Sequence, residues 1–168
     1  VLKKVKQASA IDHSPDMVEL SKKNNRQDVE QGRAEIVQGD AAVLPWADNS
    51  FTAAVSANMF FFVEQPEAVL CEIYRVLKPG GRAAILEFAT PRNGFFRAVY
   101  YFYFLRVLPW LGGLISQRSA YQYLPDSVLE FPDRETFKTM MEQAGFIDVK
   151  IHDLTGGIAA VHVGTRAA

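Results

Sequence analysis

The sequence predicts an α/β fold in which helices cover a mostly parallel sheet. The main observation is segment 72–88, which holds the end of an amphipathic helix, a stop and an apolar strand. The stop is Pro79-Gly80-Gly81, because proline disfavours a helical residue before it and glycine permits a tight turn. The run Ala83–Phe88 is almost continuously apolar, as is typical of a strand covered on both faces. Up to Phe88 the chain reads strand, helix, strand, loop, strand, helix, strand, an order that favours a parallel sheet.

The composition is that of one soluble globular domain spanning residues 1–168. Of the residues, 49% are hydrophobic and 22% are charged, and the net charge of -1 argues against a nucleic-acid-binding protein. The single cysteine, Cys71, excludes an internal disulfide and a cysteine-based zinc site, and we expect it to pack in the core. The first residues do not resemble a signal peptide, so a cytoplasmic protein is expected.

Four strands are expected in the first half of the chain, at residues 8–12, 34–38, 51–56 and 82–88. The helix after the first strand begins at Ser14-Pro15-Asp16, since serine caps, proline suits the first turn and aspartate complements the helix dipole. A second helix begins near Pro66 and is expected to reach Lys78. Ligands of parallel sheets lie at the carboxyl ends of the strands, so residues 87–90 should face a site.

Residues 91–131 interrupt the alternation and are expected to form an inserted helical lid. Eight of the 20 aromatic residues lie between Phe95 and Trp110. A helix that spans a membrane needs about 20 apolar residues, and Arg97, Arg106 and Pro109 interrupt the run, so we reject that interpretation. The aromatic side chains either fill ordinary core or line a pocket for a large apolar ligand.

The last part of the chain predicts a helix and a hairpin. The helix at 133–144 carries Phe137 and Met141 on its inner face and ends at Gly145. Strands at 147–154 and 157–165 are joined by Thr155-Gly156, and this antiparallel hairpin should close the edge of the sheet.

Two acids directly follow strands, Asp12 after Ile11 and Asp40 after Gly39. In α/β folds that bind nucleotides, an acid in the first position accepts hydrogen bonds from ribose hydroxyls. The second carboxylate could accept from an adenine amino group, whereas the simpler alternative is that each acid caps a loop or helix. His13 could shape a nucleotide pocket beside Asp12. No glycine-rich phosphate loop and no metal-ligand pairing of histidines is found, so no metal is expected.

Four motifs together resemble class I S-adenosylmethionine-dependent methyltransferases: I-D-H-S-P-D-M at 11–17, G-D-A-A-V-L-P-W at 39–46, N-S-F-T-A-A-V-S at 49–56 and Y-R-V-L-K-P-G-G-R at 74–82. Further motifs resemble the ubiquinone/menaquinone biosynthesis C-methyltransferases. These are R-V-L-P at 106–109, Y-Q-Y-L-P-D-S at 121–127, F-P-D-R-E-T-F at 131–137, E-Q-A-G-F at 142–146 and L-T-G-G-I-A-A-V-H-V-G-T at 154–165. The resemblance covers nearly the whole chain.

The resemblance implies a Rossmann-like methyltransferase sheet and S-adenosylmethionine as cofactor. It places Asp12 at the cofactor ribose, Asp40 with Ala41 at the adenine and Ser56 at the methionine portion. His13, Met17 and Ala57 complete the expected cofactor-binding set. The lid would cover a quinol ring and its isoprenoid tail. No catalytic residue is assigned; Tyr121, Tyr123 and His162 are candidates by family position, with structural roles as the alternative.

The sequence departs from the family pattern at three places. The family's first strand and glycine-rich loop should precede Val1, so the sheet is expected to lack its first strand. Thr52 stands where the family usually has aspartate. Ala57-Asn58-Met59-Phe60-Phe61 stands where the quinone enzymes usually read Phe-Gly-Leu-Arg-Asn, and the missing arginine is the residue to which a base-assisting role is ascribed.

Two classes of function follow. The first is C-methylation of a prenylated quinol or related apolar aromatic acceptor, with another small molecule or lipid as the alternative acceptor. The second is a truncated or accessory chain that does not bind the cofactor. As partners we expect an apolar aromatic small molecule, peripheral contact of a cytoplasmic protein with a membrane, and a homodimer, but no nucleic acid.

Overall fold

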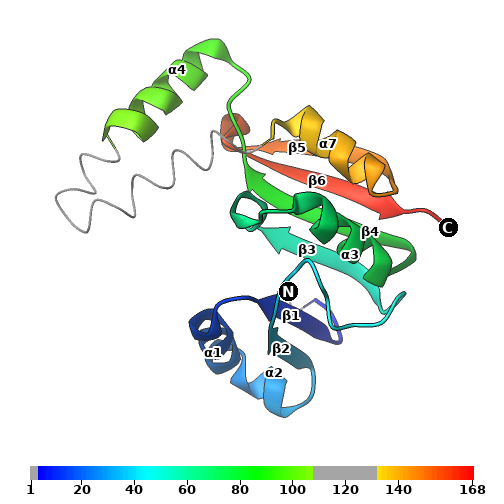
Figure 1. Cartoon of the computed structure of the whole chain (residues 1–168). Coiled ribbons are helices and arrows are strands. Elements are labelled where there is room, and N and C mark those ends of the chain that lie inside the picture. Colours follow the sequence, from blue (N-terminus) through cyan, green and yellow to red (C-terminus); the bar gives the residue numbers. More distant parts are fainter. Residues whose placement is uncertain (1–3, 108–131) are drawn as a thin grey trace.

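The computed structural model describes residues 4–107 and 132–168 (Figure 1). Strands β1 (Ala8–Asp12) and β2 (Ala34–Gln38) form a parallel pair. A second sheet has the order β3-β4-β6-β5, with bounds Phe51–Ala57, Leu77–Phe88, Ala159–Arg166 and Phe146–Leu154. The α/β class is confirmed, and β1, β2 and β3 lie at or within one residue of the predicted bounds.

The single continuous sheet that the sequence predicts is not found among the described residues. β1 pairs only with β2, and β3 pairs only with β4, so β1 and β3 each keep one unpaired edge in this part of the chain. Val55, in the middle of β3, is 69% exposed although its strand is apolar. The described strands therefore form two separate sheets.

The β1–β2 pair is covered by helices α1 (Pro15–Asn24) and α2 (Arg26–Glu30). Ser14 caps α1 as predicted, because its Oγ accepts a hydrogen bond from the backbone N–H of Met17 at 3.4 Å. In the parallel register Asp12 lies opposite Gln38, so the two strands end at the same edge.

Helix α3 (Pro66–Val76) ends before the predicted Lys78, and β4 begins at Leu77 instead of residue 82. Leu77 pairs with Phe51, and the ladder resumes with Arg82 opposite Ala53. The residues 78–81 form an irregularity inside the strand rather than a separate turn. Gly81 is required there, because a Cβ on it would lie 2.8 Å from the carbonyl oxygen of Lys78.

The core lies between the four-stranded sheet and two helices, α3 and α7 (Arg134–Gln143), which pack on the same face (Figure 1). It is formed by Phe60, Val69, Leu70, Ile73, Leu77, Ala83, Ile85, Phe137, Met141, Phe146 and Val149. The prediction that β4 is covered on both faces is wrong for the described residues, since alternate residues of β4 are only half-buried.

Cys71 is exposed, which corrects its expected core position, because it lies on the outer side of α3.

Helix α4 (Gly94–Phe102) follows β4 and continues into a π-helical turn, η2 (Tyr103–Val107). It extends away from the sheet (Figure 1). Tyr100 is 7% exposed, whereas Phe95 is 81% and Phe102 is 65% exposed. The part of the predicted lid at 108–131 lies outside the described residues. Among the helices of the described part, none is long and apolar enough to cross a membrane.

The C-terminal strands form the antiparallel pair that the sequence predicts, joined by the 3₁₀ turn η3 (Thr155–Gly157). The last strand, β6, lies between β4 and β5 and is antiparallel to both, so β5 rather than β6 forms the edge. The Arg166 guanidinium donates hydrogen bonds to the carbonyls of Tyr74, Arg75 and Leu77, which fastens β6 to the end of α3.

Candidate functional site

Asp12 and Asp40 both lie at the carboxyl edge of the β1–β2 pair. Asp12 is the last residue of β1, and its carbonyl oxygen accepts the N–H of Gly39 at 3.0 Å. Gly39 follows β2 and packs on the side chain of Ile11, the β1 residue before Asp12. A Cβ on Gly39 would lie only 2.9 Å from Ile11 Cδ1. The two strand ends therefore lie side by side, and each is followed or closed by an acid.

The Asp12 carboxylate is half-exposed and partly engaged by its own chain. Oδ1 accepts a hydrogen bond from the Ser14 N–H at 2.9 Å, which orients the carboxylate at the start of α1. His13 Nδ1 lies 3.8 Å from Asp12 Oδ1, and the imidazole points into solvent with 90% of its side chain exposed. Met17 is also exposed, in the first turn of α1. The three residues form an open surface.

The Asp40 carboxylate shapes the loop after β2. Its Oδ1 accepts the Ala42 N–H at 2.8 Å, a short turn that leaves the side chain exposed. Ala41 and Ala42 pack against the main core, so the loop connects the two sheets. The loop-capping alternative for this acid is therefore observed, and the second carboxylate oxygen remains available for a ligand.

Arg75, in α3, holds the next part of this loop. Its guanidinium donates to the carbonyls of Leu44 and Trp46 at 3.0 and 2.9 Å. It also pairs with Asp48 and Glu72, each at 2.7 Å. The hydrogen bond from Arg75 is the main cause that lowers the pKa of Glu72. A planar, multiply donating side chain thus fixes the loop that leaves Asp40.

Ser56 and Ala57 end β3, at the carboxyl edge of the second sheet. The Ser56 Oγ is buried and finds no hydrogen-bond partner within residues 4–107 and 132–168. Asn58 follows in the left-handed conformation with φ of 52°, and its N–H donates to the Leu86 carbonyl at 2.9 Å. A buried hydroxyl without a partner is unusual, so its donor is suited to an additional acceptor.

Glu87 is a polar residue of this edge whose role the sequence did not indicate. It is 1% exposed and directed inward, although residues 87–90 were expected to face a site. Oε1 accepts the N–H groups of Met59 and Phe60, both at 2.9 Å, and burial raises the pKa of the carboxyl group. Glu87 therefore supports the turn after β3 from inside the core.

Of the three catalytic candidates, only His162 lies in the described part of the chain, and it is not at this edge. His162 is buried in β6 beneath α7, and its Nε2 lies 3.0 Å from the Arg134 carbonyl oxygen. Burial lowers the pKa of His162, which favours the neutral ring. This placement agrees with the structural alternative. Tyr121 and Tyr123 lie outside the described residues.

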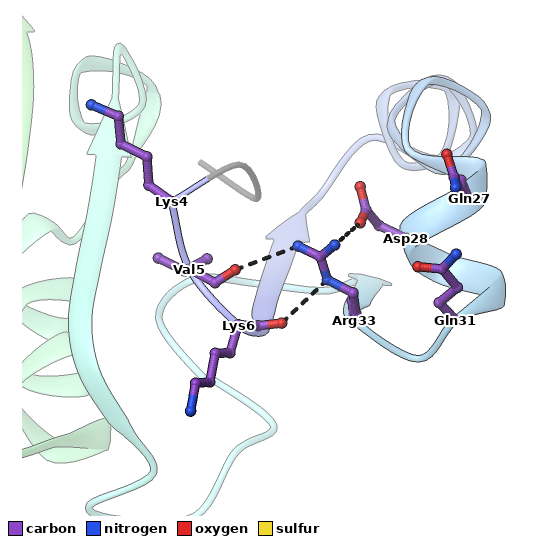
Figure 2. Close-up of a pocket in the computed structure, with 7 residues that line it drawn as sticks. All are labelled: Lys4, Val5, Lys6, Gln27, Asp28, Gln31 and Arg33. Carbon is purple, nitrogen blue, oxygen red and sulfur yellow. Dashed lines mark hydrogen bonds and ion pairs between the residues drawn. The ribbon is translucent and has the colours of Figure 1, made fainter.

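A hollow of 590 Å³ lies at the opposite end of the β1–β2 pair, among Lys4, Val5, Lys6, Gln27, Asp28, Gln31 and Arg33 (Figure 2). These residues precede β1 and β2 or belong to α2, so the hollow is remote from Asp12 and Asp40. Two of the charged residues that line it, Arg33 and Asp28, pair with each other at 3.2 Å. In residues 4–107 and 132–168 no cluster of metal-ligating side chains is found.

The sequence and the fold have known relatives. The profile of the ubiE/COQ5 methyltransferase family matches residues 1–166. The ubiquinone/menaquinone biosynthesis C-methyltransferase UbiE of Geobacter sp. (strain M21) is 49% identical over 157 residues, which cover 93% of this chain and 66% of that protein. The demethylmenaquinone methyltransferase of Thermus thermophilus is 44% identical over 156 residues, covering 92% of this chain and 70% of that protein. The chain thus spans about two thirds of the length of these relatives.

A solved structure shares the fold at low sequence identity. Phosphoethanolamine N-methyltransferase 2 of Haemonchus contortus, in complex with S-adenosyl-L-methionine, superposes with a TM-score of 0.69. The two sequences are 13% identical, and the match covers 96% of this chain and 44% of that one. The likeness supports the α/β arrangement of sheet and helices alone.

Proposed function

Since the chain belongs to the ubiE/COQ5 methyltransferase family, we propose that the complete protein is an S-adenosylmethionine-dependent C-methyltransferase of ubiquinone or menaquinone biosynthesis. The observation that carries this proposal is the pair Asp12 and Asp40, placed at adjacent strand ends in a chain that the family profile matches almost throughout. The acceptor would be a quinol ring with an isoprenoid tail.

The cofactor fits the charges of the candidate site. S-Adenosylmethionine has no phosphate and a positive sulfonium group, so a site with two carboxylates and no phosphate loop suits it. Asp12 would accept the ribose hydroxyls and Asp40 the adenine amino group, since ionised carboxylates only accept hydrogen bonds. Ala41 would lie against the adenine. His13 and Met17 would border the ribose on the α1 side, where both are exposed.

Ser56 and Ala57 would contact the methionine portion of the cofactor. The buried Ser56 Oγ supports this, because a carboxylate of the methionine portion would supply the acceptor that the hydroxyl lacks among the described residues. Glu87 supports the same segment indirectly, since it binds the N–H groups of the turn after β3. The bound cofactor supplies an electrophilic methyl group. The protein would then hold the acceptor carbon in line with that methyl group and exclude water.

The exposed aromatic face of α4 supports an apolar acceptor. Phe95 and Phe102, at the two ends of the helix that follows β4, present large rings to solvent. Arg97 and Arg106 lie in the same segment, and residues 88–125 contain no aspartate or glutamate. Aromatic side chains with arginines and no acids suit the interface of an anionic membrane. We include peripheral membrane contact of a cytoplasmic enzyme in the proposal, because a prenylated acceptor resides in the membrane.

The test uses the complete protein, titrated with S-adenosylmethionine in a calorimeter and assayed for methyl transfer to a demethylated quinol. We expect saturable cofactor binding and a new carbon–methyl bond on the quinol ring. If the protein binds the cofactor but transfers the methyl group only to another small molecule or lipid, that compound replaces the quinol as the proposed acceptor. The absence of cofactor binding would overturn the enzymatic proposal in favour of an accessory chain.

A further inference from the structure

Asp153, near the end of β5, joins the two chain segments that flank residues 94–131. Its Oδ2 accepts a hydrogen bond from Arg92 Nε at 2.9 Å, just before α4. Its Oδ1 lies 2.8 Å from Arg134 Nε, at the start of α7, as an ion pair. One carboxylate therefore ties together residues that are 42 positions apart in the sequence and that belong to different elements.

Arg134 extends this connection to the backbone. Its two terminal nitrogens donate to the carbonyls of Thr90 and Gly157, each at 2.6 Å. The Arg134 side chain is 11% exposed, so its buried positive charge needs compensation, which these carbonyls and Asp153 provide. The exit of β4, the start of α7 and the turn η3 thus converge on one guanidinium.

The turn η3 also contacts α4 directly. A Cβ on Gly156 would lie 2.7 Å from Phe96 Cε1, so the ring of Phe96 packs on the bare backbone of this glycine. Gly156 and Gly157 have φ values of 67° and 91°, which glycine adopts without strain. Thr90 Oγ1 lies 3.4 Å from the Tyr101 hydroxyl, which adds a contact between the β4 exit and α4.

We propose that Asp153, through Arg92 and Arg134, is a positioning residue that fixes α4 against η3 and thereby sets the affinity for the apolar acceptor. This inference rests on the proposed function, because it assigns the exposed face of α4 to acceptor binding. Asp153 itself contacts neither the acceptor nor the cofactor. Its loss should loosen α4 and weaken acceptor binding without altering the region of Asp12 and Asp40.

The decisive variant is Asp153→Asn in the complete protein, because it keeps the shape and removes the charge shared by the two arginines. The matched control is Asp148→Asn, an exposed acid of the same strand whose φ of 53° asparagine tolerates. Hydrogen exchange of the α4 amides is measured together with KM for a prenylated quinol and Kd for S-adenosylmethionine.

We expect Asp153→Asn to speed exchange in α4. The acceptor KM should rise about tenfold if about one molecule in ten keeps α4 in place, since affinity falls with the fraction of the binding-competent state. The cofactor Kd and the exchange of β4 and β6 should not change, and Asp148→Asn should resemble the unsubstituted enzyme. Arg92→Gln added to Asp153→Asn should raise the KM little further, since both substitutions break the same connection.

Unchanged α4 exchange, an unchanged acceptor KM or a uniform loss of protection throughout the molecule would each overturn the positioning role. Failure of the proposed function looks different, because the unsubstituted enzyme would then not methylate the quinol. The exchange measurement needs no activity, and it would still show whether Asp153 holds α4; unchanged exchange would overturn the inference in that case as well.

Discussion

Glu87 and Phe60 are joined by a hydrogen bond inside the core, in which the Glu87 Oε1 accepts the Phe60 N–H at 2.9 Å. Both residues are 1% exposed. The same oxygen accepts the Met59 N–H, so one carboxylate satisfies two backbone donors of the turn after β3. Since Ser56 and Ala57 directly precede this turn, Glu87 connects the end of β4 to the expected methionine side of the site.

Glu87→Ala should therefore destabilise the protein strongly. Each of the two N–H groups left without an acceptor costs about 1–3 kcal/mol, so we expect a loss of about 2–6 kcal/mol in the free energy of unfolding. Urea denaturation of the complete protein measures this loss. Glu64→Ala, at an exposed acid before α3, serves as the control and should stay within about 0.5 kcal/mol of the unsubstituted protein.

The buried Glu87 carboxyl group should also make stability depend on pH. Burial raises its pKa in the folded state, so the folded protein holds this proton to higher pH than the unfolded chain does. The stabilising contribution is complete below the unfolded-state pKa and decreases as the pH rises through the raised folded-state pKa. Glu87→Gln cannot ionise, and unfolding curves at several pH values above 4 should show a flatter pH dependence for this variant. An identical dependence in both proteins would contradict the prediction.

Asp12→Ala should weaken the binding of S-adenosylmethionine. A hydrogen bond to a charged group contributes about 1.5–3 kcal/mol, so the dissociation constant should rise roughly ten- to hundredfold. Isothermal titration calorimetry of the complete protein gives the comparison, with Glu19→Ala on the exposed side of α1 as the control. Equal affinity of the Asp12 variant and the unsubstituted protein would remove this carboxylate from the site.

The aromatic residues of α4 should separate into two groups on substitution. Tyr100 is buried, and Tyr100→Ala should cost about 3–5 kcal/mol of stability, as is usual for a buried aromatic residue. Phe95 and Phe102 are exposed, so their replacement by alanine should leave the melting temperature nearly unchanged.

The same two exposed-ring variants should penalise long-tailed acceptors. Each tail methylene that is no longer buried costs about 0.8 kcal/mol, so methyl transfer should decline more for long tails than for short ones. Acceptors that differ only in tail length provide the assay. Equal losses for every tail length would assign the exposed rings another role and weaken the quinol assignment.

Local signals in the sequence predicted those parts of the fold that depend on neighbouring residues. The Ser14 cap and the strands at 8–12 and 34–38 follow from capping chemistry and apolar patterning, and they were confirmed. The start of β4 at Leu77 was missed, because it depends on pairing with Phe51 across the sheet. The burial of β4 on one face was missed too, since a continuous apolar run does not reveal which faces are covered.

In the candidate site too, features set by neighbouring residues could be predicted from the sequence, whereas contacts between distant residues could not. Asp12 and Asp40 could be placed at one edge because parallel strands align their carboxyl ends. The inward direction of Glu87 and the pairing of Asp153 with Arg92 could not, because each joins residues 27 or more positions apart in the chain. Such contacts follow from tertiary packing, for which neither charge nor spacing in the sequence provides a signal.

The separation of the two described sheets has a consequence for how firmly the β1–β2 pair is held. The β1–β2 pair shares no strand ladder with β3 in the described structure, and of its strands and helices only Val18 and Ala34 are buried core residues. This unit can open without breaking a ladder hydrogen bond of the larger sheet, and the loop through Ala41 and Ala42 is its packed link to the main core. A ligand that contacts both Asp12 and Ser56 would bind only when the two units are folded together. Its binding would therefore couple their unfolding, and both units would melt in a single transition.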